Sequence, residues 1–150
     1  MEQTVSFSDL GLSAEIVSAL SRQGITVPFE VQTESIPDAM LGKDICCRAP
    51  TGSGKTLAFG LPLIAKCPVA EPHYPTALIL TPTRELAEQI TTVLTPLAEA
   101  VSLEVISVYG GVSYNKQMDA LRRGTDILVA CPGRLLDLID KGALDLDDIE

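Results

Sequence analysis

The 150-residue sequence contains no tryptophan, only 4% aromatic residues and a single histidine. So few aromatic rings argue against a platform on which single-stranded bases stack. No stretch approaches the roughly 18 uninterrupted apolar residues of a membrane-spanning helix. The first five residues also lack the basic start and apolar run of a signal peptide. We therefore expect a cytoplasmic protein that does not enter a membrane.

Basic residues are scarce as well, because 11 Lys and Arg side chains stand against 20 Asp and Glu, which gives a net charge of −9. Nucleic-acid binding normally draws on a basic face, so bulk charge does not attract nucleic acid to this chain. Any such contact must be local and geometric, or shared with another domain. The four cysteines lack the paired spacing of metal sites, which is typical of a reduced, cytosolic protein.

Apolar residues make up 46% of the chain, enough for the core of about one domain. Apolar runs bounded by glycine, proline and threonine predict parallel strands at residues 44–48, 77–80, 104–109 and 126–130. Helices are expected at residues 13–20, 27–41, 55–65, 84–100, 113–123 and 134–141. Strands that alternate with helices imply right-handed βαβ units. We predict an α/β fold in which a parallel sheet lies between two layers of helices.

A glycine-rich loop joins the first predicted strand to the helix predicted at 55–65, with the sequence Ala49-Pro50-Thr51-Gly52-Ser53-Gly54-Lys55-Thr56. Glycines allow successive N–H groups to turn inward, and the helix N-terminus adds partial positive charge. Lys55 supplies a point charge for the β- and γ-phosphates, and Thr56 presents a hydroxyl to Mg²⁺. The alternative is a plain glycine-rich turn that caps a helix. The position between strand and helix favours a phosphate-binding loop.

Further motifs occur in a fixed order around this loop: Phe7, Gly24 to Gln32, Pro82-Thr83-Arg84-Glu85-Leu86-Ala87, Gly110-Gly111 and Cys131-Pro132-Gly133-Arg134. In this order, and with alanine at the start of the phosphate loop, the chain resembles the first RecA-like domain of DEAD-box RNA helicases from Phe7 to about Glu150. The resemblance implies a RecA-like P-loop NTPase fold. It also implies an adenine-recognition segment at residues 1–42, followed by the P-loop core of the same domain at residues 43–150.

The resemblance implies an ATP site in which Gln32 recognises adenine. A carboxamide offers a donor and an acceptor together, which matches the N6 amino group and N7 of adenine. Taken alone, Gln32 would be a solvent-facing helix residue and Phe7 a core residue. The implied ATP-binding residues are Phe7, Ile25, Gln32, Ala49, Thr51, Gly52, Ser53, Gly54, Lys55 and Thr56, with Lys55 and Thr56 catalytic and Thr56 the Mg²⁺ ligand. Ile25 stands where the family usually has an aromatic residue.

The resemblance also implies that the remaining motifs contact the RNA sugar–phosphate backbone, independent of sequence. Backbone N–H groups and an arginine at a helix start can meet a phosphate, and glycine lets the RNA approach closely. Cys131 departs from the family's usual threonine, and a thiol is a weaker hydrogen-bonding group than a hydroxyl. Taken singly, each motif is an ordinary turn or helix start. The implied RNA-binding residues are Pro82, Thr83, Arg84, Gly110, Gly111, Pro132, Gly133 and Arg134.

The implied function is that of the N-terminal portion of an ATP-dependent RNA helicase, with ATP and Mg²⁺ as cofactors and RNA as partner. We expect the acidic Asp-Glu-Ala-Asp motif within about ten residues after Glu150 and a second RecA-like domain later. The chain alone is then expected to be an inactive monomer with a sheet incomplete at its C-terminal end.

Two alternatives remain open. A nucleotide-gated RNA clamp or scaffold would carry identical motifs, and duplex-unwinding assays would separate it from a helicase. A small P-loop kinase would explain the phosphate loop but not Gln32 or the motifs at Pro82-Thr83-Arg84 and Pro132-Gly133-Arg134.

Overall fold

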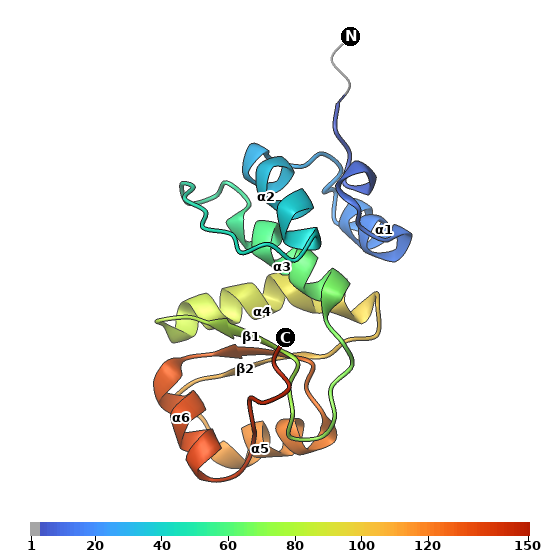
Figure 1. Cartoon of the computed structure of the whole chain (residues 1–150). Coiled ribbons are helices and arrows are strands. Elements are labelled where there is room, and N and C mark those ends of the chain that lie inside the picture. Colours follow the sequence, from blue (N-terminus) through green and yellow to red (C-terminus); the bar gives the residue numbers. More distant parts are fainter. Residues whose placement is uncertain (1–3) are drawn as a thin grey trace. The chain divides into compact units, whose positions relative to one another are not determined.

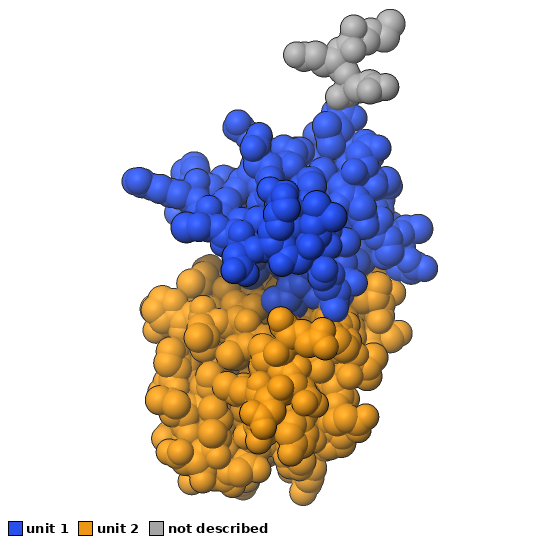
Figure 2. All heavy atoms as spheres, in the orientation of Figure 1, with its two compact units in different colours: residues 1–66 blue, residues 67–150 orange. Residues whose placement is uncertain are grey.

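The computed structural model describes residues 4–150. They form two compact units, of which one ends at Lys66 and the other begins at Cys67 (Figure 2). This division separates groups of mutual contacts. The boundary predicted between residues 42 and 43 is of another kind, because it divides an adenine-recognition segment from the P-loop core of the same domain. That boundary stays a prediction. Within the described residues, every helix is too short or too polar to span a membrane.

The unit that ends at Lys66 is helical among its described residues (Figure 1). A short 3₁₀ helix, η1, spans Ser8–Leu10, and three α-helices follow: α1 at Ala14–Arg22, α2 at Glu30–Met40 and α3 at Lys55–Lys66. Helix α2 packs against α3. Each α-helix turns apolar side chains inward, and Leu20, Ile36 and Leu61 are fully buried. The helices expected in this part of the chain are therefore confirmed, with ends that differ by a few residues.

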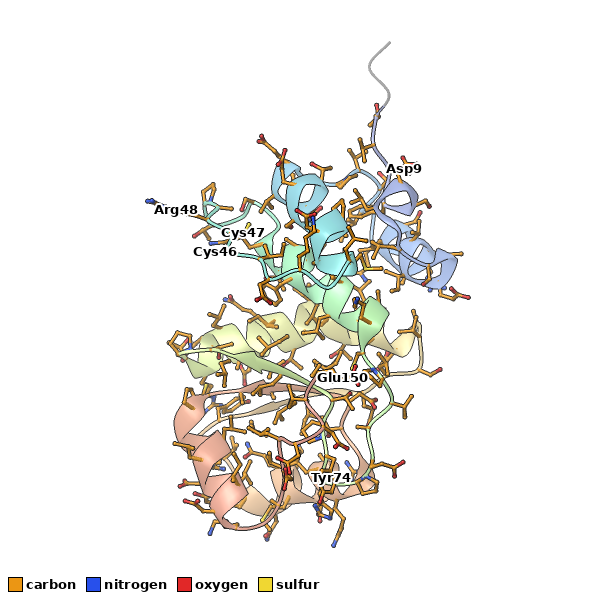
Figure 3. All side chains as sticks on the ribbon, in the orientation of Figure 1. Asp9, Cys46, Cys47, Arg48, Tyr74 and Glu150 are labelled. Atoms are coloured by element: carbon orange, nitrogen blue, oxygen red, sulfur yellow. The ribbon has the colours of Figure 1, made fainter. Side chains whose placement is uncertain are left out.

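The strand predicted at residues 44–48 does not form, so that prediction is wrong. Residues 43–50 carry no helix or strand, and both Cys46 and Cys47 are exposed rather than packed in a sheet. Figure 3 labels the two cysteines and Arg48 along this stretch between α2 and α3. A strand is held by hydrogen bonds to a neighbouring strand. Residues 4–66 contain no other strand that could supply them.

The unit that begins at Cys67 contains a three-stranded sheet. Its strands are β1 at Ala77–Leu80, β2 at Val105–Val108 and β3 at Ile127–Ala130. They are parallel and lie in the order β1-β3-β2, with Leu80 and Val108 both opposite Ala130. All four residues of the central strand β3 are buried. This is the burial expected of a parallel strand that is covered on both faces.

Helices cover both faces of this sheet. Helix α4, at Arg84–Glu99, packs on β2 and β3. Helices α5, at Tyr114–Arg123, and α6, at Pro132–Asp140, share a core cluster with Leu128 and Ala130 of β3. Because side chains alternate along a strand, α4 lies on the opposite face from α5 and α6, as Figure 1 shows. The predicted α/β fold with a parallel sheet between two helical layers is confirmed in this unit.

Candidate functional site

Three of the predicted motifs meet at one edge of the parallel sheet. Because the strands are parallel and in register, the residues that follow Leu80, Val108 and Ala130 all leave the sheet at its carboxyl edge. Hydrogen bonds join these exits: Thr81 N–H donates to Ala130 O at 2.9 Å, and Cys131 N–H donates to Val108 O at 2.9 Å. The carboxyl edge is where open α/β sheets bind their ligands.

The first motif at this edge starts helix α4. The Thr83 hydroxyl accepts a hydrogen bond from Leu86 N–H at 3.2 Å and is the N-cap of the helix. The Thr81 hydroxyl donates to Thr83 O at 3.1 Å, which holds the residue before the helix in place. Arg84 is the first helical residue, and about half of its side chain is exposed. The fold thus presents a guanidinium at a helix N-terminus, where anions are favoured.

Tyr109 lies beneath the Arg84 guanidinium. The Arg84 Cζ atom is 4.9 Å from the centre of the Tyr109 ring. The Tyr109 hydroxyl donates to Glu88 Oε1 at 2.5 Å, and Arg84 Nε is 3.8 Å from the same oxygen. The bond to Glu88 raises the pKa of Tyr109. A cation over an aromatic face is attracted to it, so the ring helps to orient the arginine.

The second motif, Gly110-Gly111, lies beside this arginine. Gly111 has a φ of +85°, a backbone conformation that favours glycine, and a Cβ added there would be 3.6 Å from Arg84 Nη1. Around Gly110 a Cβ would meet nothing within 4 Å. The double glycine therefore leaves open space beside a cation, which is the arrangement a phosphate backbone needs for close approach.

The third motif, at the start of α6, has two different parts. Pro132 is the first helical residue, so the backbone N–H groups of Gly133 and Arg134 lie at a helix N-terminus. The Arg134 side chain, by contrast, is only 8% exposed. Its Nη1 donates to Val112 O and to Gln117 Oε1, both at 3.0 Å. The Arg134 side chain is thus bound inside the protein, and its partner Val112 directly follows the double glycine.

A second tyrosine supports this buried arginine. The Arg134 Cζ atom is 3.8 Å from the centre of the Tyr114 ring. The Tyr114 hydroxyl donates to Asp137 Oδ2 at 2.8 Å, and that bond raises the pKa of Tyr114. Both arginines of the edge are therefore stacked on a tyrosine, and each tyrosine is bonded to a carboxylate on the arginine's own helix. The Cys131 thiol lies 3.7 Å from the Thr81 hydroxyl and makes no cap bond for α6.

The predicted phosphate loop lies in the other unit, ahead of α3. Gly52 and Gly54 have φ values of +79° and +84°. Within the described residues, the N–H groups of Gly54, Lys55 and Thr56 donate no hydrogen bond, and the exposed Lys55 forms no ion pair. Such a run of open N–H groups at a helix start is an anion-binding arrangement.

Not every group in the phosphate loop is available. The Ser53 hydroxyl donates to Pro50 O at 2.5 Å, and Ser53 N–H donates to the same oxygen at 3.3 Å. These two bonds close a tight turn, and the Thr51 hydroxyl makes no hydrogen bond among the described residues.

Gln32 is bonded to this loop. Its Nε2 donates to Gly54 O at 3.1 Å, and its Oε1 accepts from Phe29 N–H at 2.9 Å. With 1% of its surface exposed, Gln32 is buried, so the alternative of a solvent-facing helix residue is excluded. A Cβ at Gly54 would lie 2.4 Å from Gln32 Nε2 and 2.8 Å from Phe29 Cδ2. The geometry thus makes glycine a requirement at this point of the loop.

The other two residues of the implied adenine site differ in character. Phe7 is 2% exposed and belongs to the core, next to a turn in which Ser6 N–H donates to Asp9 Oδ2 at 2.8 Å. That bond and a second one from the Ser6 hydroxyl lower the pKa of Asp9. Ile25 is half-buried, and its N–H donates to Leu20 O at the end of α1. Phe7 and Ile25 therefore support the fold around the site.

Sequence reasoning did not single out Gln117, Tyr109, Tyr114 or Phe29. Gln117 is a polar residue on the buried face of an amphipathic helix, three residues after Tyr114 and four before Leu121, and that pattern is a usable signal. Phe29 is an aromatic residue beside the glycine loop that remains 58% exposed. An exposed aromatic next to a predicted nucleotide loop is a second signal of this kind.

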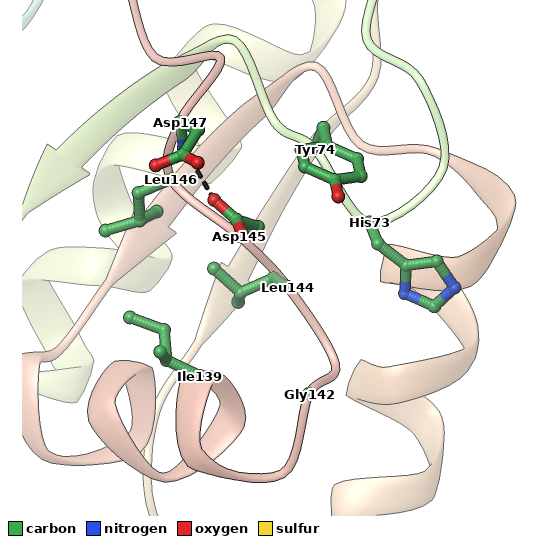
Figure 4. Close-up of a pocket in the computed structure, with 8 residues that line it drawn as sticks. All are labelled: His73, Tyr74, Ile139, Gly142, Leu144, Asp145, Leu146 and Asp147. Atoms are coloured by element: carbon green, nitrogen blue, oxygen red, sulfur yellow. Dashed lines mark hydrogen bonds between the residues drawn. The ribbon is translucent and has the colours of Figure 1, made fainter.

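A cavity of about 560 Å³ lies elsewhere in the unit that begins at Cys67 (Figure 4). It lies between the loop that precedes β1 and the chain after α6, at the amino edge of the sheet and away from the three motifs. His73 lines it, and its Nδ1 is 2.8 Å from Ala143 O. Asp147 N–H donates to Asp145 Oδ1 at 2.8 Å, as the dashed line shows. Among residues 4–150 no group of three or more His, Cys, Asp or Glu side chains is placed to hold a metal ion.

A family model described as DEAD/DEAH box helicase matches residues 29–150. The chain belongs to this family. It is 43% identical to the ATP-dependent RNA helicase DeaD of Escherichia coli, over 99% of this chain and 24% of that protein. It is 41% identical to the chloroplastic DEAD-box ATP-dependent RNA helicase 3A of Zea mays, over 99% of this chain and 21% of that protein.

Solved structures agree with this assignment to the DEAD/DEAH box helicase family. The RNA helicase Prp28 of Chaetomium thermophilum, bound to ADP, is 38% identical with a TM-score of 0.85, over 95% of this chain and 36% of that one. A DEAD box protein of Methanococcus jannaschii is 38% identical with a TM-score of 0.87, over 97% of this chain and 39% of that one. This helicase-family chain spans about a quarter of the length of the curated relatives, 21% and 24% for the two named here.

Proposed function

We propose that this chain binds ATP and ADP through its glycine loop and the sugar–phosphate backbone of RNA at the carboxyl edge of its sheet. In the full-length protein these two sites would drive local unwinding of RNA duplexes at the expense of ATP. The observation that carries the proposal is the convergence of three glycine- and arginine-bearing loops at one sheet edge. An acidic chain can hold a polyanion at such a local arrangement without a basic face.

The glycine loop fits a nucleotide phosphate on two observations. The N–H groups of Gly54, Lys55 and Thr56 are unused within the described residues, and a Cβ at Gly52 would meet nothing within 4 Å. The loop therefore combines donors with space above them. Lys55 would hold the β- and γ-phosphates, as a lysine does in P-loop proteins.

Mg²⁺ would be held by Thr56 together with the nucleotide. The hydroxyl of Thr56 makes no hydrogen bond among the described residues, so it is available as a ligand. Mg²⁺ is commonly bound by few protein oxygens together with substrate phosphates. When bound, the ion would neutralise charge on the phosphates. The chain's own contribution is to orient the phosphates through the loop N–H groups.

Adenine would be recognised by Gln32, with an apolar face supplied by Phe29. Each end of the Gln32 carboxamide has one hydrogen-bonding position left beyond the bonds to Gly54 and Phe29. Because Gln32 is buried, recognition requires a local rearrangement when the nucleotide binds. The exposed Phe29 ring lies against the loop, where it can cover a base in place of the aromatic residue that Ile25 replaces.

RNA would be held by backbone N–H groups at the starts of α4 and α6, by Arg84 and by the open approach at Gly110-Gly111. ATP and RNA would then favour a closed state with a second RecA-like domain, in which one RNA strand is bent and its partner is lost. Each ligand can drive closure only as far as it binds the closed state more tightly. We further propose that the chain works as a monomer in the cytosol, for which its four free cysteines give support.

Calorimetric titration with Mg·ADP and Mg·GDP tests the nucleotide site. We expect ADP to bind at least about tenfold more tightly than GDP, because a site built for hydrogen bonds rejects a base that leaves them unpaired. Lys55→Ala should weaken both nucleotides. Phe29→Ala should weaken both by a similar factor, since stacking does not distinguish the bases. Equal binding of ADP and GDP would keep the phosphate loop but contradict adenine recognition by Gln32.

The RNA site needs its own test. Binding of a single-stranded oligonucleotide to the full-length protein should weaken in Arg84→Ala by a similar factor for every RNA sequence. A plot of the logarithm of RNA affinity against the logarithm of salt concentration should also have a shallower slope in this variant. The slope should change by about 0.7, the value for one lost phosphate contact on a single strand. Unchanged affinity and salt dependence in Arg84→Ala would contradict the placement of RNA at this edge.

A further inference from the structure

Gln117 is a buried polar residue that no motif of the chain accounts for. It lies on α5, is 7% exposed, and uses both ends of its carboxamide. Its Nε2 donates to Tyr109 O at 3.2 Å, and its Oε1 accepts from Arg134 Nη1 at 3.0 Å. The orientation of the amide is determined by these partners, because a guanidinium only donates and a carbonyl only accepts.

Arg134 completes this network at the other end of the same loop. The Nη1 atom that donates to Gln117 also donates to Val112 O at 3.0 Å. Tyr109 and Val112 are the residues immediately before and after Gly110-Gly111. The Gln117–Arg134 pair therefore binds the carbonyl oxygens on both sides of the double glycine. A third contact, the Tyr114 ring 3.8 Å from Arg134 Cζ, fixes the guanidinium from its face.

The Gln117–Arg134 pair thus holds the glycine loop by the carbonyl groups of Tyr109 and Val112. The N–H groups of Gly110 and Gly111 stay available. Among residues 4–150, neither the Gly110 N–H nor the Gly111 N–H donates a hydrogen bond to the protein. Two glycines in sequence are otherwise free to take many conformations, and Gly111 is already in the left-handed region at φ +85°. We call the Gln117–Arg134 pair, with its bonds to Tyr109 O and Val112 O, the brace. Without the brace, the free energy of ordering this loop would have to come from RNA binding.

We propose that Gln117 is a positioning residue for RNA binding: with Arg134 it holds Gly110-Gly111 in the conformation in which the loop N–H groups meet a phosphate. The inference rests on the proposed function, because it assumes that RNA binds at this edge. It assigns to the Arg134 side chain an indirect part in RNA binding, through the loop, while the α6 N-terminus offers its backbone N–H groups.

The chemistry explains why this position carries a glutamine. The site needs one donor toward Tyr109 O and one acceptor toward Arg134, and a carboxamide supplies both on one side chain. A glutamate at the same position would keep the acceptor and lose the donor. A methionine of similar length would lose both. The two substitutions therefore separate the arginine contact from the loop contact.

The test is the affinity of the full-length protein for a single-stranded oligouridine, with a non-hydrolysable ATP analogue present, in Gln117→Met and Gln117→Glu. We expect RNA affinity to fall about tenfold in Gln117→Met, because two buried hydrogen bonds that order the loop are lost. ADP affinity should stay within about twofold of the wild type, since the nucleotide site lies on other residues. Gln89→Met is the matched control, because the Gln89 side chain on α4 is exposed and makes no hydrogen bond among the described residues.

The salt dependence distinguishes loss of the loop N–H contacts from loss of a charged contact, and unchanged ADP affinity excludes general destabilisation. Backbone N–H groups carry no net charge, so Gln117→Met should weaken RNA binding without changing the slope of affinity against salt. Arg84→Ala should reduce that slope. RNA affinity in Gln117→Met within about twofold of the wild type, with Arg84→Ala weakened, would overturn the brace and leave the proposed function standing.

Two further outcomes are decisive. No RNA binding by the wild-type protein would overturn the proposed function and the brace together. If Gln117→Met fails to fold, Gln117→Glu takes its place, because its carboxylate keeps the buried Arg134 paired. Weakened RNA binding in Gln117→Glu at unchanged ADP affinity then supports the brace, and wild-type RNA affinity overturns it.

Discussion

Gly54 is the glycine of the proposed nucleotide site at which an added Cβ would meet the closest contacts. A Cβ there would lie 2.4 Å from Gln32 Nε2 and 2.8 Å from Phe29 Cδ2, and the φ of +84° is unfavourable for any other residue. We predict that Gly54→Ala displaces the Gln32 carboxamide and reduces ADP affinity by at least about tenfold. Isothermal titration of Mg·ADP measures the effect.

Gly24→Ala is the control for this substitution. Gly24 has a similar φ of +76°, but nothing lies within 4 Å of its added Cβ. It should lose about 1 to 2 kcal/mol of stability through backbone strain and keep its ADP affinity. Equal ADP affinity in Gly54→Ala and Gly24→Ala would show that the contact with Gln32 is not needed for nucleotide binding.

Tyr109 is a second residue whose contacts can be tested by single substitutions. Tyr109→Ala removes the ring that lies 4.9 Å from Arg84 Cζ, and we predict RNA affinity about two- to fivefold weaker. Tyr109→Phe keeps the ring and loses only the bond to Glu88, so its loss should be smaller. Fluorescence anisotropy with labelled RNA measures both. An equal loss in the two variants would assign the effect to the hydroxyl instead of the ring.

The pH dependence of this tyrosine has a definite sign. The bond to Glu88 raises the pKa of Tyr109 above its unfolded value of about 10. A raised pKa means a stabilising contribution that is complete below the unfolded pKa and is lost as pH rises through the folded pKa. The difference in the free energy of unfolding between the wild type and Tyr109→Phe should therefore be constant from about pH 6 to pH 9. A difference that fades within that range would contradict the bond to Glu88.

At the scale of elements, local signals predicted the helices well and one strand badly. Ser13 and Thr83 precede helices and cap them, and Gly124 follows the end of α5. The strand predicted at 44–48 failed because a strand depends on a neighbour that lies elsewhere in the chain. Residues 77–80 have a similar apolar pattern and do form a strand, since β3 runs beside them.

Thr83 links the start of α4 to stability. Its hydroxyl accepts from Leu86 N–H at 3.2 Å, and loss of such a cap costs about 1 kcal/mol. We predict that Thr83→Ala lowers the free energy of unfolding by that amount, whereas Thr83→Ser keeps it within a few tenths of a kcal/mol. Urea unfolding measured by circular dichroism gives both values. A Thr83→Ser variant as unstable as Thr83→Ala would show that the methyl group, and not the cap, carries the effect.

At the scale of the whole molecule, the order of the three motifs along the chain could be predicted from the sequence. Their position together at the carboxyl edge of the sheet could not. The order of Pro82-Thr83-Arg84, Gly110-Gly111 and Pro132-Gly133-Arg134 is local information. Their meeting depends on the strand order β1-β3-β2, which sets which carboxyl ends are neighbours. The buried state of Arg134 was likewise not predictable, because a basic residue at a helix start is usually exposed. Its burial is accompanied by two hydrogen bonds from Nη1, to Gln117 Oε1 and Val112 O, and by the Tyr114 ring over its Cζ atom.

The cysteines test the fold over both units, because they differ in exposure. Cys46 and Cys47 are exposed on the stretch without a strand, whereas Cys67 is half-buried beside Thr76 and Asp126. Burial raises the pKa of the Cys67 thiol. Because the thiolate is the reactive form, Cys67 should be alkylated more slowly than Cys46 and Cys47 near pH 8, by about tenfold or more.

Mass spectrometry of peptides from the iodoacetamide-treated chain measures these rates separately. Raising the pH should speed the alkylation of Cys67, because its raised pKa leaves thiol still to be ionised. In concentrated urea, where burial is lost, Cys67 should approach the rates of Cys46 and Cys47. Protection of Cys46 and Cys47 in the native chain would contradict their exposure on the stretch between α2 and α3.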